Sequence, residues 1–275
     1  MTSDDVGALP EASVPLRSEI GQKLAARHNR RMRGDPDSGE ASWADLPEGP
    51  EIIGETTPLP QRSRRSDAIR ERLMDAAELL FARSGYTGVS VRDVTDLAQT
   101  RLAHITYNFG SKQNLYLAVL RRRAVPLAVD RERALETLLA DPPADDQAWL
   151  RGYVDAYVDP ALARLASGET GWRSYLRLIG NVAYSRLWPQ SLIGPYNETA
   201  YVYIDALSRR FPKAGPVLTQ HLFLMMVASS MYTLARTGRV ETFNQPAFAS
   251  DDLDLLGPMT KQFIVDGLSA ALISL

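Results

Sequence analysis

From Ser66 onward, apolar residues recur at every third or fourth position, and no segment alternates apolar and polar residues as a half-buried strand does. The stretch SDAIRERLMDAAELLFARSGY shows this pattern most clearly and predicts an amphipathic helix of about eighteen residues that ends near Gly85. Five later segments, punctuated by residues such as Pro160 and Pro258, predict further helices over 145–166, 171–188, 194–211, 214–236 and 257–275. The expected fold class is therefore all-α.

Two very short helices are predicted after the first long one. In SVRDVTDLAQ, Ser90 and Asp93 have the spacing of a capping box, and Val94, Leu97 and Ala98 form its apolar side. The stretch LAHITYNFGSK predicts a second short helix. A long supporting helix followed by two short helices around a tight turn is the arrangement of a helix-turn-helix.

The boundaries of these short helices can also be read from the sequence. Gln99 stands in the turn where Gly would be easiest, so a left-handed backbone there would carry strain. Gly110 ends the second short helix, and Ser111 caps the next one. That next helix is expected to end at the basic run Arg121–Arg123, where cations suit a helix C-terminus.

Charge is unevenly distributed along the chain. The net formal charge is −2, but residues 62–123 carry twelve basic and six acidic side chains. A basic segment in an otherwise acidic protein indicates a module that binds a polyanion, although a solvated basic face is the simpler alternative. The basic stretch QRSRR before the first helix could act as an arm in the minor groove of DNA.

Residues 1–65 are expected to form a separate N-terminal extension. Within it, 34–60 contain five Pro, four Gly and seven acids with no basic residue, which predicts a disordered acidic linker. The chain has no Cys, so a cytoplasmic setting is expected, and its three scattered His do not suggest a metal site. The most apolar stretch, 217–235, contains Gln220 and His221 and is interpreted as a buried helix of a soluble protein, not a membrane span.

Residues 69–120 resemble the DNA-binding domain of the tetracycline-repressor (TetR) family of transcriptional regulators over its full length and without a gap. The pieces that carry the resemblance are AAELLFARSGY, SVRDV and the tail YNFGSK followed by LY. The resemblance implies a helix-turn-helix DNA-binding domain over 66–123 and a helical ligand-binding and dimerisation domain over 124–275. It also implies a homodimer on a palindromic double-stranded DNA operator, acting as a ligand-responsive repressor. No cofactor or metal is expected.

Carried over position by position, the resemblance assigns DNA contacts to eleven residues. Those offered to base edges are Leu102, Ala103 and His104, while Thr106, Tyr107, Asn108 and Lys112 would hold the phosphate backbone. The further candidates are Ser90, Arg92, Thr100 and Arg101.

Simpler interpretations of these residues stay open at this point. Ile105 and Phe109 are expected to anchor the helix, but Leu102 has a spacing that also suits the core. His104 could be exposed without a partner, and Tyr107 could pack on the supporting helix. Leu102 and Gln99 both depart from the commoner family pattern, which leaves the details of base reading open.

The second half resembles the family only weakly, and its style is closer to members that respond to acyl or other lipophilic compounds. A homodimer is expected to form through the last two helices, whose apolar content suits a four-helix bundle. Candidate ligand-binding residues are Tyr153, Tyr157, Trp172, Tyr175, Asn181, Tyr184, Trp188, His221 and Met225.

Two other classes of protein are alternatives to a regulator. The sequence contains no nucleophile elbow, phosphate-binding loop or dinucleotide fingerprint, so an enzyme is not expected. The alternative that stays open is a helical adaptor, or a nucleoid-type protein that binds DNA without sequence preference and without an effector.

Overall fold

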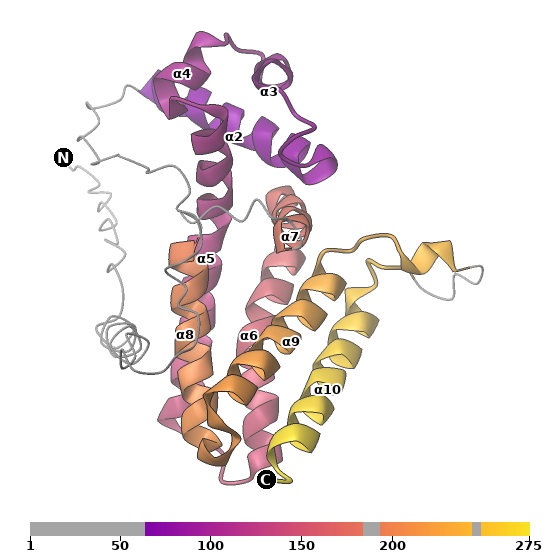
Figure 1. Ribbon diagram of the computed structural model, residues 1–275. Coiled ribbons are helices and arrows are strands. Elements are labelled where there is room, and N and C mark those ends of the chain that lie inside the picture. Colours follow the sequence, from indigo (N-terminus) through magenta and orange to yellow (C-terminus); the bar gives the residue numbers. More distant parts are fainter. Residues whose placement is uncertain (1–63, 184–192, 244–248) are drawn as a thin grey trace, which may run out of the picture. The chain divides into compact units, whose positions relative to one another are not determined.

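The structure is a computed structural model that describes residues 64–183, 193–243 and 249–275 (Figure 1). Helices make up nearly all of these ranges, and no strand occurs in them, so the predicted all-α class is confirmed. The acidic linker and the rest of the expected N-terminal extension lie outside the described residues.

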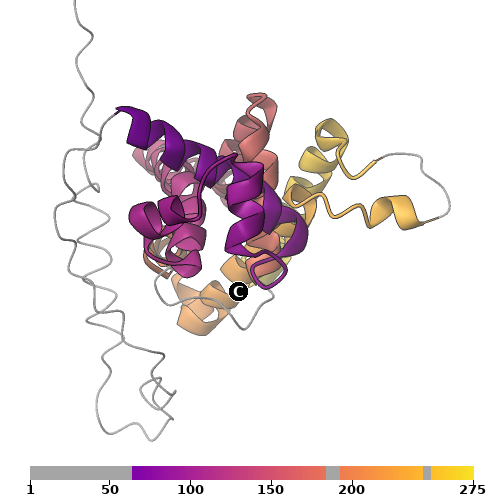
Figure 2. The same ribbon diagram turned by 90° about the horizontal axis from the view of Figure 1, so that it is seen from above.

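The first three helices are α2 (Arg64–Ser84), α3 (Val91–Leu97) and α4 (Ala103–Phe109). They lie together in both views (Figure 1, Figure 2) and share one hydrophobic cluster. Gly85 follows α2 with a φ of +68°, a conformation that glycine adopts without steric cost, and Gly110 follows α4 with a φ of +76°. The predicted helix ends at these two glycines are confirmed.

Helix α5 (Lys112–Ala140) is much longer than the sequence pattern predicts. Ser111 caps it as expected, since its Oγ accepts a hydrogen bond from the Asn114 N–H at 3.1 Å. The prediction that the helix ends at Arg121–Arg123 is wrong, because its buried face continues through Ala124 and Leu127. The expected domain boundary at 123/124 therefore falls inside α5.

Five more helices follow, close to the predicted ranges: α6 (Asp146–Ala166), α7 (Thr170–Ala183), α8 (Ile193–Arg210), α9 (Gly215–Leu234) and α10 (Leu253–Leu272). Two short 3-10 turns, η3 (Pro212–Ala214) and η4 (Val240–Thr242), lie on either side of α9.

Two of the punctuating prolines lie inside helices, as the predicted ranges also have them. Pro160 is within α6 and Pro258 is within α10. A proline removes one backbone donor and disturbs the hydrogen bonding of the preceding turn. In α6 the carbonyl of Tyr157, in that preceding turn, accepts a hydrogen bond of 2.9 Å from Arg131 Nε. Contacts from a neighbouring helix thus help α6 to continue through Pro160.

Two hydrophobic clusters organise the described part of the chain. One joins α2–α5 to parts of α6 and α7 and includes Phe81 and Leu115. The other joins α6, α8, α9 and α10 and includes Trp149 and Tyr203. Helix α5 contributes to both, with Leu127 in the first and Leu135 in the second. A movement within the second cluster can therefore reach α2–α4 through α5.

Helix α9 is apolar on almost every side. By length and composition, the segment 212–234 is the one described helix that could cross a membrane, and 33% of its most apolar window is buried. Only part of α9 is buried, so the expectation of a buried helix is met in part. The remaining apolar side chains lie on its outer face.

Candidate nucleic-acid interface

Helix α4 has one buried and one exposed side. Ile105 and Phe109 are only 3% and 8% exposed, whereas Leu102 is 47% and Tyr107 is 64% exposed. Ala103 lies on the exposed side. The expectation that Ile105 and Phe109 anchor the helix is confirmed, and the alternatives that place Leu102 in the core or pack Tyr107 away are wrong. The first turn of α4 is therefore free to meet a partner.

Helix α3 is held at its N-terminus by the predicted capping box. Ser90 Oγ accepts a hydrogen bond from the Asp93 N–H at 3.1 Å, and Asp93 accepts one from the Ser90 N–H at 2.7 Å. The hydrogen bond from the Ser90 N–H, followed by that of the Ser90 side chain, holds the pKa of Asp93 below its usual value. Ser90 and Arg92 are both exposed at this end of α3.

Leu97 does not follow the predicted apolar side of α3. It is largely exposed, while Val94 and Ala98 are buried as predicted and Thr95 takes a further buried position. Thr95 satisfies its hydroxyl by donating to the Arg92 carbonyl at 3.0 Å, which makes its burial possible.

The turn between α3 and α4 is strained and orders a histidine. Gln99 has a φ of +50°, so the strain predicted from the absence of Gly is confirmed. Next to it, the Thr100 hydroxyl and His104 Nδ1 share a hydrogen bond of 2.5 Å. His104 therefore has a partner, contrary to the alternative of a free histidine. The bond fixes the ring and leaves Nε2 as its other polar atom, while Arg101 and Thr106 are exposed nearby.

Two of the residues expected to contact phosphates are less exposed than Tyr107. Asn108 is half-buried, and its amide donates a hydrogen bond of 2.8 Å to the His104 carbonyl. Lys112 is half-buried at the N-terminus of α5, with its Nζ 4.3 Å from the centre of the Tyr86 ring. This cation–π contact orients the ammonium, and its charge adds to that of the helix N-terminus.

A buried ion pair joins the supporting helix α2 to α5 and α7. Glu78 is 3% exposed, and its Oε1 lies 3.0 Å from Arg123 Nε. Burial raises the pKa of Glu78, although the hydrogen bond and charge of Arg123 act in the opposite direction. Arg123 also contacts Glu169 at 2.8 Å and stacks on Trp172 at 5.1 Å.

Helix α7 meets this ion pair at a glycine. A Cβ on Gly171 would lie 2.6 Å from Glu78 Oε2 and even closer to the Arg123 guanidinium. The absence of a side chain at residue 171 lets the first turn of α7 approach the ion pair this closely. The sequence interpretation took Arg123 as part of a helix C-terminus, and it missed the joint role of Gly171 and Arg123.

The expected ligand-binding residues fall into several groups. Tyr153 and Tyr157 are buried and both contact the Tyr203 ring, with centroids 5.4 and 5.2 Å away. Trp172 and Tyr175 are buried in the other cluster, edge to face at 5.9 Å.

The remaining ligand candidates do not join these aromatic groups. His221 and Met225 lie on the exposed face of α9, which corrects their assignment to an interior pocket. The reason is that α9 is apolar all round, so its sequence does not reveal which side is buried. The side chain of Asn181, and the whole of Tyr184 and Trp188, lie outside the residues whose placement is described.

The sequence interpretation also missed two tyrosines of α8. Tyr196 shares a hydrogen bond of 2.9 Å with Tyr175, hydroxyl to hydroxyl, and Tyr203 donates one of 2.9 Å to the Arg131 carbonyl. Tyr196 and Tyr203 are seven residues apart, a spacing that places them on one helix face and could have identified them.

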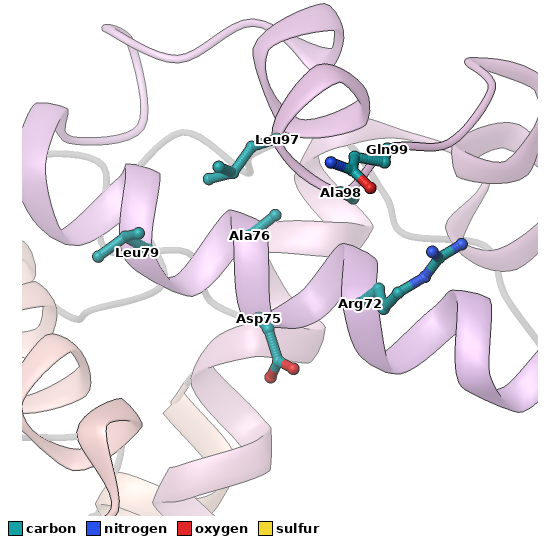
Figure 3. A pocket seen from close by; sticks show the side chains of 7 residues that line it. All are labelled: Arg72, Asp75, Ala76, Leu79, Leu97, Ala98 and Gln99. Atoms are coloured by element: carbon teal, nitrogen blue, oxygen red, sulfur yellow. The ribbon is translucent and has the colours of Figure 1, made fainter.

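A hollow of about 320 Å³ lies between α2 and α3, and Figure 3 shows its lining residues. It is open to solvent and combines Leu79 and Leu97 with the charged Arg72 and Asp75. It lies in the helix-turn-helix region, not among the aromatic residues expected to bind a ligand.

Helices α2–α4 and the exposed first turn of α4 define a helix-turn-helix DNA-binding regulator. The model of the family "Bacterial regulatory proteins, tetR family" matches residues 73–119. A second model, "Tetracyclin repressor-like, C-terminal domain", matches 155–267. The chain belongs to the TetR family, whose members are DNA-binding regulators and not enzymes.

Three similar proteins carry comparable descriptions. The HTH-type transcriptional repressor NicS of Pseudomonas putida is 32% identical over 81 residues, which are 30% of this chain and 38% of NicS. The HTH-type transcriptional repressor AcnR of Corynebacterium diphtheriae is 27% identical over 143 residues, 50% of this chain and 72% of AcnR. The crystal structure of the hemolysin II transcriptional regulator HlyIIR has a TM-score of 0.50 at 15% identity, over 74% of this chain and 97% of HlyIIR, and shows the shared fold.

Proposed function

We propose that this chain is a transcriptional repressor that binds a palindromic operator as a homodimer and leaves it when a small apolar effector binds. The observation that carries the proposal is the exposed first turn of α4 on a helix pinned by Ile105 and Phe109. Recognition helices read bases with their N-terminal residues. Both described relatives are named as repressors, which supports the direction of control.

In this proposal the exposed residues of α4 divide between bases and phosphates. Leu102 and Ala103 pack on thymine methyl groups, and His104 Nε2 forms a hydrogen bond at a base edge. Tyr107 donates its hydroxyl to a phosphate oxygen, and Lys112 adds a point charge. Ser90, Arg92, Thr100, Arg101, Thr106 and Asn108 complete the assigned DNA contacts.

The dimer forms through the outer faces of α9 and α10. On α9 the exposed side chains include Val217, Leu224, Met225 and Tyr232, which share one face by their spacing. On α10 the main one is Phe263, which is 71% exposed. Large exposed apolar patches of this kind mark interaction surfaces, and two copies of a helix pair form a four-helix bundle. Such a dimer would present two α4 helices about 34–36 Å apart, one turn of DNA.

Release follows from a shift between two arrangements of the molecule. An effector that binds better when α6–α8 are arranged differently favours that arrangement. Helix α7 packs closely against the Glu78–Arg123 pair at Gly171. A movement of α7 therefore changes the position of α2 and of α4, which packs on α2. The spacing of the two recognition helices then no longer fits the operator.

Footprinting of the full chain on the DNA upstream of its own gene tests the proposal. The expected result is one protected palindrome whose protection disappears with an effector and returns without it. Uniform coverage without a protected palindrome would instead support the nucleoid-type alternative. Replacing Leu102 and Ala103 with Gly is expected to abolish the selective protection.

A further inference from the structure

Arg131 is a cation fixed within the aromatic part of the C-terminal domain. It lies on α5, is half-buried, and has its Cζ 3.8 Å from the centre of the Tyr157 ring. Its Nε donates a hydrogen bond of 2.9 Å to the Tyr157 carbonyl. The ring and this hydrogen bond hold the planar guanidinium in one orientation.

The two terminal nitrogens of Arg131 have no protein partner in the described part of the chain. No carboxylate of the described residues lies within 4.0 Å of these two nitrogens. The nitrogens are not fully buried, so they border accessible space. In contrast, Arg122 and Arg123 on the same helix each bind a carboxylate. A guanidinium whose two terminal nitrogens are both free can donate two parallel hydrogen bonds to one anion.

The tyrosine hydroxyls near Arg131 already have hydrogen-bond partners within the protein, whereas one indole N–H of the same aromatic group has none among the described residues. The hydroxyls of Tyr153 and Tyr203 donate to backbone carbonyls, and those of Tyr175 and Tyr196 bond to each other. The indole N–H of Trp172, whose ring contacts Tyr175, is buried and has no hydrogen-bond acceptor in the described chain.

The positive charge of Arg131 reaches the paired tyrosine hydroxyls. Burial raises the pKa of Tyr175 to about 12, and Arg131 acts against this rise. Burial likewise raises the pKa of Tyr196, and Arg131 again lowers it. A cationic ligand beside these groups would meet a like charge, whereas an anion would meet an opposite one.

We propose that the effector is an apolar carboxylate whose anionic group pairs with the terminal nitrogens of Arg131 while its apolar part lies among the tyrosines of α6, α7 and α8. This inference rests on the proposed function, in which the C-terminal domain takes up a small effector. It adds the charge and chemical class of that effector.

The test compares probes that differ only in their charged group. Straight-chain carboxylates of about four to sixteen carbons are matched with the alcohols and amines of the same length, and binding to the full chain is measured by calorimetry and by thermal shift. The carboxylate is expected to bind at least about tenfold more tightly than its alcohol, since charge-assisted hydrogen bonds are the stronger ones. The amine is expected to bind more weakly than both.

Arg131→Gln is expected to remove the preference for the carboxylate and leave binding of the alcohol nearly unchanged. The matched control is Arg133→Gln, because Arg133 is exposed on the same helix and should keep the preference. The melting temperature of each variant without ligand checks that it is folded.

Equal binding of acid and alcohol by the wild type, or a carboxylate preference that survives in Arg131→Gln, would overturn the inference. The absence of any carboxylate effect on the wild type would overturn it as well. Operator binding without ligand is measured on the same samples and decides the proposed function separately. A chain that binds its operator but prefers alcohols remains a repressor with a different effector.

Discussion

At the scale of single residues, the proposed DNA interface separates side chains that read bases from those that hold phosphates. His104 is assigned to the first kind, with its ring fixed by Thr100 through Nδ1. Lys112 is assigned to the second kind, with its ammonium at the N-terminus of α5 and over the Tyr86 ring. The two residues should therefore respond differently to substitution.

Replacing Lys112 with Ala is expected to weaken binding to all DNA sequences alike. One phosphate contact per protomer is lost, so the slope of log K against log salt should become shallower by about 0.9 for each protomer. Titrations at several salt concentrations measure this slope. Lys213→Ala, in η3, is the control and should leave the slope unchanged. An unchanged slope for Lys112→Ala would remove this residue from the interface.

Replacing His104 with Ala is expected to change sequence preference more than overall affinity. A lost base contact costs roughly 1–3 kcal/mol at one base-pair position and little elsewhere. Affinities for single-base operator variants provide the measurement. Thr100→Val, which keeps the ring but removes its hydrogen bond, should relax the same position more mildly. If His104→Ala leaves the base preference intact, the assigned base contact is wrong.

The buried carboxylate of Glu78 makes stability depend on pH. Burial is the largest cause of its raised pKa, so the folded state binds the proton more tightly than the unfolded state does. This contribution is complete below the ordinary pKa of 4.5 and is lost as pH rises through the folded-state pKa. The melting temperature of the wild type should therefore fall relative to that of Glu78→Gln over this range. A wild-type melting temperature that rises relative to that of Glu78→Gln as pH increases would contradict the sign.

At the scale of elements, local signals in the sequence predict helix starts and ends better than helix lengths. The capping box at Ser90, the glycines that follow α2 and α4, and the strain at Gln99 follow from residue chemistry and are confirmed. The continuation of α5 beyond Arg123 depends on tertiary contacts, which local propensity does not contain.

The candidate site shows the same division between local and tertiary information. The exposed side of α4 follows from the spacing of Ile105 and Phe109 and from the family resemblance. The Glu78–Arg123 pair joins residues 45 positions apart, so no local pattern reveals it. The exposed stripe of α9 cannot be recognised in the sequence, because this helix is apolar on all sides. Glu78 does occupy the apolar stripe between Met74 and Phe81, which is the one sequence signal of its burial.

Replacing Gly171 with Ala tests the contact between α7 and α2. The added methyl group would overlap Arg123 and Glu78, so the start of α7 must move, at a cost of roughly 1–3 kcal/mol. For a chain of this size the melting temperature should fall by about 2–4 °C per kcal/mol. Operator affinity is expected to change too, because α2 carries α4. A variant with unchanged stability and unchanged affinity would show that this contact does not position α2.

At the scale of the whole molecule, the proposed function requires two copies of the chain. Replacing Phe263 with Glu puts a charge in the proposed α9–α10 interface and should give a monomer in light scattering. Because linking two half-sites strengthens binding by on the order of 10²-fold or more, operator affinity should fall by a similar factor. Leu139→Glu adds the same charge at an exposed leucine of α5 and serves as the control. A dimeric Phe263→Glu protein would place the interface elsewhere.

The central claim is that a dimer reads a palindrome with the first turn of α4. Selection of bound sequences from a random DNA pool by the full chain measures this most directly. The expected result is enrichment of a two-fold symmetric motif with half-sites about one helical turn apart, and loss of preference at defined positions in the Leu102→Ala and His104→Ala proteins. Binding without enrichment of any motif, or a motif unaffected by both substitutions, would contradict it.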